Sequence, residues 1–283
     1  MDTTDTLPLE ILPISWNDST YHLIQDTWLP AGTKQRGINY FRKLKDQGYT
    51  EVVTYGTVYG YGQVATAWCC REVGLLCTLF LPKTYPRTRM TREAIAYGAA
   101  VMDIGPDNNY PSTTVLAMKA RAYAAKDSNL NTGRTPSIGV GIASNSNYNH
   151  HALHDNGQQN CKRKLLELGL DDPEFIQALA DGIIAVKGNI NPKRIWVAGG
   201  SGVLTRALSK AFPETELCVV QVGRKIYPDV LQGIRYTMYI SPESFSHNAE
   251  IVPPYKSLRN YDAKVWRFVR VYGKDGDYIW NVK

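Results

Sequence analysis

The sequence contains no apolar run long enough to cross a membrane. Hydrophobic residues make up 43% of the 283 residues, but no stretch approaches the roughly 20 apolar residues of a transmembrane helix. Cysteine is scarce, with 5 in the chain, and no Cys-x-x-Cys or Cys/His spacing indicates a zinc site. The composition therefore excludes membrane-spanning and disulfide-rich classes and favours one or two globular domains with a large core.

Charge of one sign is not in large excess either. The formal net charge is +6 and the pI is about 8.9, a mild balance that does not by itself indicate nucleic acid. Residues 1–5 are polar and acidic, without the basic start and apolar stretch of a secretory signal. We expect a cytoplasmic protein with reduced thiols, or one in the host cytoplasm if the source is a virus.

Short apolar segments alternate with helical segments along the chain. Strands separated by helices of this length predict an α/β fold with mostly parallel sheets. The expected strands are Glu51–Thr54, Cys77–Leu81, Ala100–Ile104, Ser137–Ile142, Arg194–Ala198 and Leu217–Val222. The expected helices are Ile38–Gln47, Gln63–Val73, Thr88–Tyr97, Ser112–Ala125, Pro173–Val186 and Leu204–Ala211.

The first chemical motif is a lysine that follows a Gly-Thr pair. Lys34 stands in the segment 29–37, with the sequence LPAGTKQRG, ahead of a strand, a loop of small and aromatic residues, and a helix. A lysine amine can hold pyridoxal phosphate as a Schiff base. Lys34 is therefore the candidate catalytic residue, and the alternative is a surface lysine after a turn.

The second motif is a glycine-rich turn between a strand and a helix, at residues 199–202. Glycines let the backbone approach an anion, and the free amides of a helix start bind phosphate. The turn also resembles the cofactor loop of class I methyltransferases, but the strand 217–222 lacks the acidic residue that holds ribose hydroxyls there. The residues expected to bind the cofactor here are Gly199, Gly200, Ser201, Gly202 and Thr205.

The order of these motifs resembles the fold type II pyridoxal-phosphate superfamily, which includes threonine synthase, cysteine synthase and tryptophan synthase β. Residues 30–37 look like its lysine motif, and 59–67 stand where the family has a Ser-Gly-Asn-His-Gly-type loop. Residues 79–82 and 96–99 also match its pattern. The resemblance covers roughly residues 28 to 225.

This resemblance implies two three-layer αβα domains with mostly parallel sheets. Residues 44–135 would form a smaller, mobile domain. Residues 1–43 and 136–283 would form a larger domain that binds the cofactor phosphate and carries a basic C-terminal tail. A homodimer is also implied.

The resemblance also implies the chemistry. Pyridoxal 5'-phosphate would be held by Lys34 as a Schiff base, in a lyase or decarboxylase that acts on a small amino acid or amino-acid-like substrate. Lys34, once displaced by the substrate amine, would act as a general acid or base. The partner of the pyridine nitrogen should come from the C-terminal third, where the candidates are Ser241, Ser244 and Ser257. The loop residues expected to bind the substrate are Thr57, Tyr59, Tyr61, Gly62 and Gln63.

The loop departs from the family pattern at two positions. Gly60 stands where the family has an asparagine beside the pyridine hydroxyl, and Tyr61 replaces the histidine that follows. Gly60 and Asn39 are the residues expected near the ring, with Asn39 or a tyrosine hydroxyl taking over the missing contact. Because of these changes, the sequence does not identify which bond of the substrate is broken.

Three alternatives remain. The chain also resembles divergent fold type II proteins that some bacteriophages carry beside enzymes for hypermodified thymine, whose substrate would be an amino acid attached to a pyrimidine in DNA. The tail 255–283 mixes basic and aromatic residues that could bind a phosphate backbone and stack on bases, although 265–272 also fits a charged edge strand. An S-adenosylmethionine-dependent methyltransferase and a non-catalytic binding protein with this fold are the others.

A long polar segment, 143–160, interrupts the alternation of strands and helices. Such a loop is often functional, so His150, His151 and His154 are candidate proton shuttles or ligands, with an exposed linker as the alternative. His151 is the expected substrate-binding residue. Only Asp155 stands at a supporting spacing, and we predict no metal site.

Overall fold

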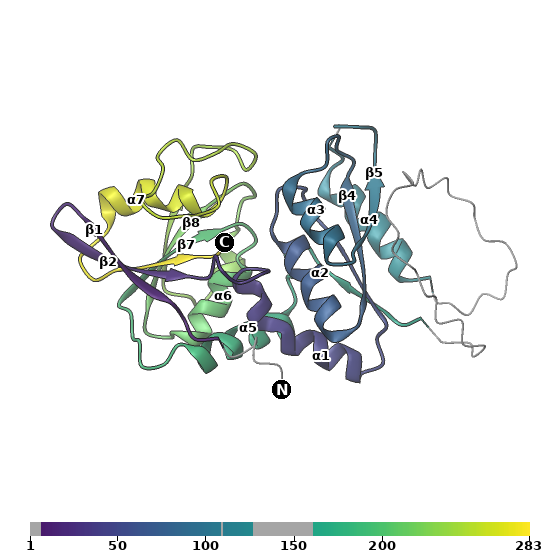
Figure 1. The fold of residues 1–283 in the computed structure, drawn as a ribbon, viewed down its shortest axis with the longest axis horizontal. Helices are drawn as coiled ribbons and strands as arrows, with labels where there is room; N and C mark the ends of the chain where they lie inside the picture. The colour runs from purple at the N-terminus through teal and green to yellow at the C-terminus, as the bar shows by residue number, and fades with distance from the viewer. Residues whose placement is uncertain (1–6, 109, 127–160) are drawn as a thin grey trace, which may run out of the picture.

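The computed structural model describes residues 7–108, 110–126 and 161–283. They form two α/β domains side by side, each built on its own sheet (Figure 1). The mostly parallel α/β architecture expected from the sequence is confirmed. None of the helices in the described ranges has the length and apolar character needed to cross a membrane.

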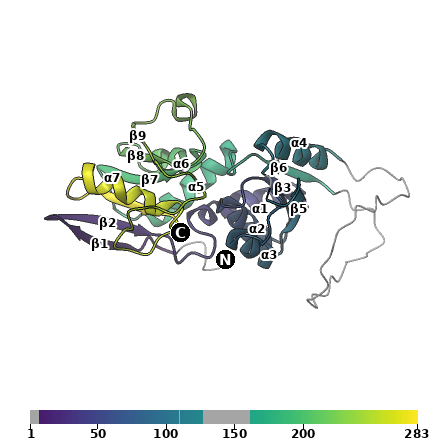
Figure 2. The ribbon, with the colours of Figure 1, turned by 90° about the horizontal axis from the view of Figure 1, so that it is seen from above.

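The larger domain is built on a six-stranded sheet in the order β1-β2-β10-β7-β8-β9. β1 pairs antiparallel with β2, and the other neighbours are parallel. Seen from above, the hairpin of β1 and β2 extends away from the smaller domain (Figure 2). The strands are β1 Ile11–Trp16, β2 Ser19–Gln25, β7 Arg194–Gly199, β8 Glu216–Gln221, β9 Tyr236–Ile240 and β10 Tyr278–Asn281.

Helices cover both faces of this sheet, so the domain has three layers. Ile195 and Val197 of β7 join the core that contains α5 (Pro173–Val186) and α6 (Val203–Ala211). Trp196, between them, joins a second core with α7 (Val265–Tyr272). Burial on both faces explains why β7 is a continuous apolar run rather than an alternating one.

The smaller domain has a parallel four-stranded sheet in the order β5-β4-β3-β6. One face packs on α4 and the other on α1 and α2, with α3 against α2. The strands are β3 Glu51–Tyr55, β4 Leu76–Pro82, β5 Ala100–Ile104 and β6 Arg163–Leu166. The helices are α1 Ile38–Asp46, α2 Gly62–Val73, α3 Arg89–Ala96 and α4 Thr113–Ala124.

The structure changes two sequence-based expectations and leaves a third untested. The boundary at residue 136 would give β6 to the larger domain, whereas β6 pairs with β3 in the smaller sheet. The edge strand expected at 265–272 is wrong: this segment is α7, because Val265, Trp266 and Val269 bury one helical face. The expected strand 137–142 lies outside the described residues.

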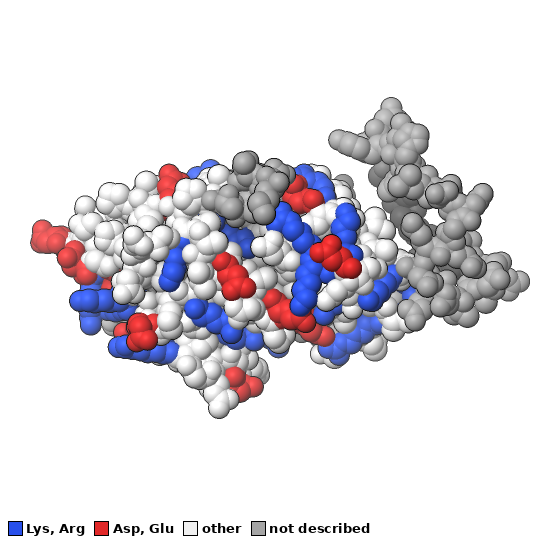
Figure 3. All heavy atoms as spheres, turned by 90° about the horizontal axis from the view of Figure 1, so that it is seen from below, with Lys and Arg blue, Asp and Glu red and all other residues white. Residues whose placement is uncertain are grey.

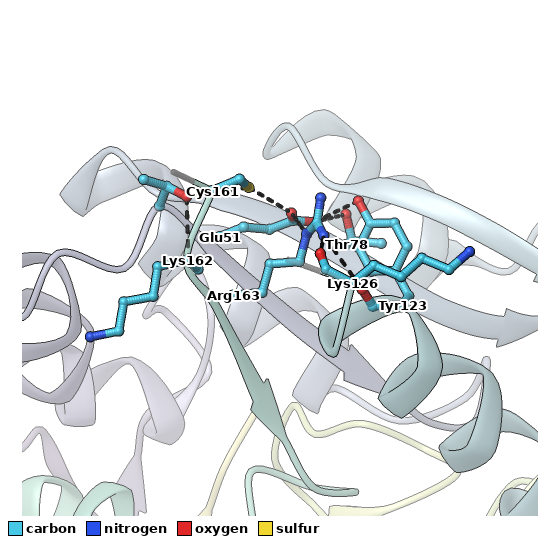
Figure 4. A network of polar contacts seen from close by, with 8 residues as sticks. Glu51, Thr78, Tyr123, Lys126, Cys161, Lys162 and Arg163 are labelled. Carbon is cyan, nitrogen blue, oxygen red and sulfur yellow. Dashed lines mark hydrogen bonds and ion pairs between the residues drawn. The ribbon is translucent and has the colours of Figure 1, made fainter. Parts of the chain in front are cut away.

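A buried carboxylate, Glu51, ties the amino ends of the smaller sheet together (Figure 4). It accepts hydrogen bonds from Thr78 of β4 at 2.6 Å and from Tyr123 of α4 at 3.0 Å, and it pairs with Arg163 of β6 at 2.8 Å. Arg163 also donates to the carbonyl of Lys126. The network therefore joins β3, β4, β6 and α4 at the strand ends opposite the cleft described below.

Candidate active site

A cleft of about 170 Å³, partly open to solvent, lies between the two sheets. It is lined at the carboxyl ends of parallel strands from both sheets, where open α/β folds bind ligands. The C-terminal residue of the chain also reaches it, between the two domains (Figure 1). The cleft brings together these predicted residues: Lys34, Thr57, Tyr59, Gly60, Tyr61, Gly62, Gln63, Gly200 and Ser201.

Lys34 lies in a short 3-10 helix, Thr33–Gly37, whose other side chains are locked in the core. Arg36 forms a buried ion pair with Asp26 at 2.6 Å, and Thr33 donates to the same carboxylate at 2.8 Å. The indole of Trp280 in turn donates to the Thr33 hydroxyl at 2.9 Å. Because its neighbours face inward, the turn presents Lys34 to the cleft in a fixed direction.

The amine of Lys34 is buried and hydrogen-bonds one main-chain carbonyl. Its Nζ donates to the oxygen of Gly169 at 2.6 Å. Burial lowers its pKa to about 8, while the carboxylate of Asp171 acts in the opposite direction. Gly169 has φ of 77° and a Cβ there would lie 2.6 Å from the Ser201 hydroxyl, so only glycine allows this approach. Lys34 is thus a partly neutral amine near neutral pH, as a nucleophilic lysine requires.

The glycine turn leads into α6 and leaves its first amides without a side-chain cap. Gly202, at φ of 81°, is the N-cap, and the first turn of the helix carries no acidic residue. The hydroxyl of Thr205 is buried and has no hydrogen-bond partner among the described residues. Free amides, a helix dipole and an unpaired hydroxyl together suit a phosphate group. Gly199, Gly202 and Thr205 belong to the same segment but do not line the cleft.

Two adjacent residues, Tyr261 and Asp262, complete this side of the cleft and escaped the sequence reasoning. Asp262 is 1% exposed, its Oδ2 accepts from the Lys283 amide at 3.1 Å, and its Oδ1 has no partner in the described part of the chain. Burial raises its pKa to about 8. Tyr261 donates to the carbonyl of Ala198 at 3.2 Å and packs against Gly200. No motif in the sequence marks this pair, which lies within the basic and aromatic tail 255–283.

The loop between β3 and α2 is held largely by its own side chains. The buried amide of Gln63 donates to the carbonyls of Thr57, Val58 and Gly60 at 3.1 to 3.2 Å. The Tyr61 hydroxyl donates to Glu93 at 2.8 Å. By contrast, the buried hydroxyl of Thr57 has no partner among the described residues. Of these side chains, Thr57 is the one free to bind a ligand, and Gln63 and Tyr61 shape the loop.

Several predicted residues lie away from the cleft. Asn39 is on the exposed face of α1, where it accepts from Arg42 at 2.7 Å. Ser241 donates to Glu243 at 2.7 Å, Ser244 is exposed, and Ser257 is part-buried outside the cleft lining. Asp262, which also belongs to the C-terminal third, lines the cleft, whereas these serines do not. His150, His151 and His154 lie outside the described residues.

The chain has the same fold as several solved structures. A homologue of ACC deaminase aligns with a TM-score of 0.69 at 14% identity, covering 97% of this chain and 88% of that one. Diaminopropionate ammonia lyase from Escherichia coli gives 0.59 at 10% identity, with 98% and 82% covered. A pyridoxal 5'-phosphate-dependent aspartate racemase gives 0.52 at 12% identity, with 97% and 75% covered.

By sequence, no family model and no curated protein matches the chain. The fold is that of the fold type II pyridoxal-phosphate-dependent enzymes, as the motif order implied. No group of three or more metal-type ligands occurs in the ranges that the structure covers.

Proposed function

We propose that this chain binds pyridoxal phosphate covalently through Lys34 and is a lyase or decarboxylase for an amino acid or amino-acid-like amine. The observation that carries the proposal is the composition of the cleft. A buried amine of lowered pKa, an uncapped glycine turn and a buried carboxyl with one unpaired oxygen all line or adjoin it. In that order, these groups can bind the aldehyde, the phosphate and the ring nitrogen of pyridoxal phosphate.

The residues fit the cofactor as follows. Gly200 and Ser201 would hold the phosphate through their amides, with the unpaired hydroxyl of Thr205 behind them. Asp262 would face the ring nitrogen with its unpaired oxygen. The side chain of Lys34 would supply the covalent bond.

When bound, the cofactor supplies an electron sink for the charge left on the α-carbon of the substrate. Lys34 then transfers protons near neutral pH, because its pKa is lowered to about 8. The hydroxyl of Tyr261 remains protonated, since burial and the neighbouring Asp262 raise its pKa. Its hydrogen is donated to the carbonyl of Ala198, so Tyr261 holds the turn in place on the side of Gly200.

The substrate carboxylate would lie at the start of α2. This helix has no side-chain cap and no acid in its first turn. The unpaired hydroxyl of Thr57 lies in the loop that precedes it. Together they offer main-chain and hydroxyl donors to an anion, in place of the asparagine that the loop lacks.

Reconstitution with pyridoxal phosphate tests the proposal. The protein should gain a visible absorption band, and borohydride reduction should fix the cofactor mass on the peptide that contains Lys34. Lys34→Ala should abolish both, whereas Lys43→Ala should change neither, because Lys43 lies outside the cleft, in an exposed pair with Glu174. Labelling of another lysine, or an unchanged band in Lys34→Ala, would refute the assignment.

The reaction class is read from the products of candidate amino acids. Release of carbon dioxide identifies a decarboxylase, and release of ammonia or of a side-chain group identifies a lyase. A band that shifts with amines but gives no turnover would instead support the non-catalytic alternative. Calorimetry with S-adenosylmethionine provides the matching test of the methyltransferase alternative.

A second candidate substrate is an amino acid attached to a pyrimidine of DNA. What favours it is the charge of the cleft rim. Arg224 lines the cleft and is exposed, and neither it nor the exposed Arg259 near Leu258 has a carboxylate partner within the described ranges. On the smaller domain, Arg87 and Arg89 are neutralised by Asp103 and Glu93, both at 2.7 Å.

The basic excess is local, because both signs are interspersed on the face seen from below (Figure 3). The tail itself contributes less than expected, since Arg267 pairs with Glu243 and Glu250. Binding to duplex DNA at two salt concentrations tests the candidate. Affinity should fall at higher salt, and fall further in Arg224→Ala with Arg259→Ala, whereas Arg87→Ala should leave it unchanged. Absence of salt-sensitive binding would exclude DNA.

A further inference from the structure

An ion pair lies beside Lys34 at the junction of the two domains. Arg206 of α6 donates to Asp171, which belongs to the segment between β6 and α5. The Nε atom of Arg206 is buried and has no further partner among the described residues. A guanidinium that is only partly satisfied remains available to interact with nearby charge.

The segment that carries Asp171 is the one that holds the lysine. The carbonyl of Gly169, two residues earlier, accepts the hydrogen bond from Lys34. Of the charged groups, the carboxylate of Asp171 is the one that favours the protonated amine against burial. Arg206 follows Thr205 in the helix that starts at the glycine turn. The pair therefore links the lysine to the proposed phosphate-binding helix.

The other charged groups near the cleft either pair with groups other than Lys34 or line the opposite side of the cleft. Arg36, in the same 3-10 helix, is neutralised by Asp26. Lys283 donates to the carbonyls of Leu29 and Pro30. The hydroxyl of Tyr61, in the loop beside Lys34, is directed to Glu93, and Asp262 and Arg224 line the cleft on the side of β7 and β8.

We propose that Asp171 and Arg206 are positioning residues that set the charge of Lys34. Asp171 favours the protonated amine, and Arg206 limits this effect by neutralising Asp171. The role in catalysis rests on the proposed function. There, Lys34 must lose a proton before its amine can form a covalent bond, and it must be protonated again before it can donate a proton to a substrate. The electrostatic effect itself exists in the protein without cofactor.

The two positions therefore have opposite expected effects. Asp171→Asn removes the negative charge and should lower the pKa of Lys34 by about one unit, the lower end for a neighbouring opposite charge, because Asp171 is partly exposed. Arg206→Gln leaves Asp171 unpaired and should raise that pKa. Arg206→Lys keeps the charge and should stay close to the wild type.

The test uses cofactor-free protein whose lysines carry carbon-13 at the ε-carbon. An NMR titration follows each lysine, and the signal of Lys34 is assigned by its loss in Lys34→Arg. Lys43 is the internal reference. Opposite shifts in Asp171→Asn and Arg206→Gln, with Lys43 unmoved, support the proposal.

Two results would overturn it. Equal midpoints in all variants would show that the pair has no electrostatic effect on Lys34. Shifts of the same sign in both variants would show that the pair acts through packing. Because the titration requires no cofactor, its outcome is independent of whether pyridoxal phosphate binds, which the borohydride experiment decides separately.

Discussion

The buried carboxyl of Asp262 should make the stability of the cofactor-free protein fall as pH rises. Its pKa is raised from 3.8 to about 8 by burial. A group whose pKa is higher in the folded state stabilises fully below its unfolded pKa, and this contribution is lost as pH rises toward the folded pKa. Each pH unit in that window costs about 1.4 kcal/mol. Between pH 5 and pH 7 the loss is therefore about 3 kcal/mol.

Asp262→Asn removes this titration and leaves the shape nearly unchanged. The thermal midpoint of the variant, relative to the wild type, should increase by roughly 5–10 °C between pH 5 and pH 7. Melting curves at matched ionic strength measure it, and the exposed Asp229→Asn is the control for a lost carboxyl. A difference that stays constant over this range would show that Asp262 is already ionised in the fold. Bound cofactor should flatten the trend, because a ring nitrogen gives the charged carboxylate a partner.

Three further substitutions test the supports of the site. Asp26→Ala leaves Arg36 buried without its partner and should cost about 3–5 kcal/mol in urea unfolding; a neutral result would mean that water replaces the pair. Glu51→Gln should cost a similar amount, about 3 kcal/mol, without changing cofactor affinity, because Arg163 and the rest of that network lie at the opposite strand ends; a loss of cofactor binding would contradict this. Gln63→Ala releases three loop carbonyls and should weaken substrate binding by about 1–3 kcal/mol, measured as a rise in KM; an unchanged KM would mean that the loop holds its shape without the amide.

The regular parts of the fold were predictable because each has a local signal. The helix Pro173–Val186 begins at a proline after an aspartate cap and was expected at the same residues where α5 is found. Five strands were not predicted, namely β1, β2, β6, β9 and β10. Of these, β6 and β10 are held by pairing between segments that are distant in sequence, such as Ile279 with Leu23. The segment 265–272 fits either a charged strand or a helix, and its burial against β7 decides for α7.

The site was predictable only where the sequence carries a compact motif. Lys34 and the turn Gly200–Ser201 each stand in a short recognisable segment, and the fold brings both to one cleft. Asp262 has no such segment, because its burial depends on a distant part of the chain, the residues after β10, where the Lys283 amide donates to its carboxylate. Asn39 was misplaced for the opposite reason: it is close to Lys34 in sequence, but the helix turns its side chain to solvent.

The loop between β3 and α2 has Gly60 where the resemblance implies an asparagine. A Cβ at Gly60 would lie 3.4 Å from the Thr57 hydroxyl, which is an ordinary van der Waals contact. The unpaired hydroxyl of Thr57 is buried in the loop that precedes the uncapped start of α2. Gln63 holds the loop carbonyls away from that point by occupying them. Under the proposed function, the Thr57 hydroxyl and the main-chain donors at the start of α2 would bind the anionic end of the substrate in place of an asparagine.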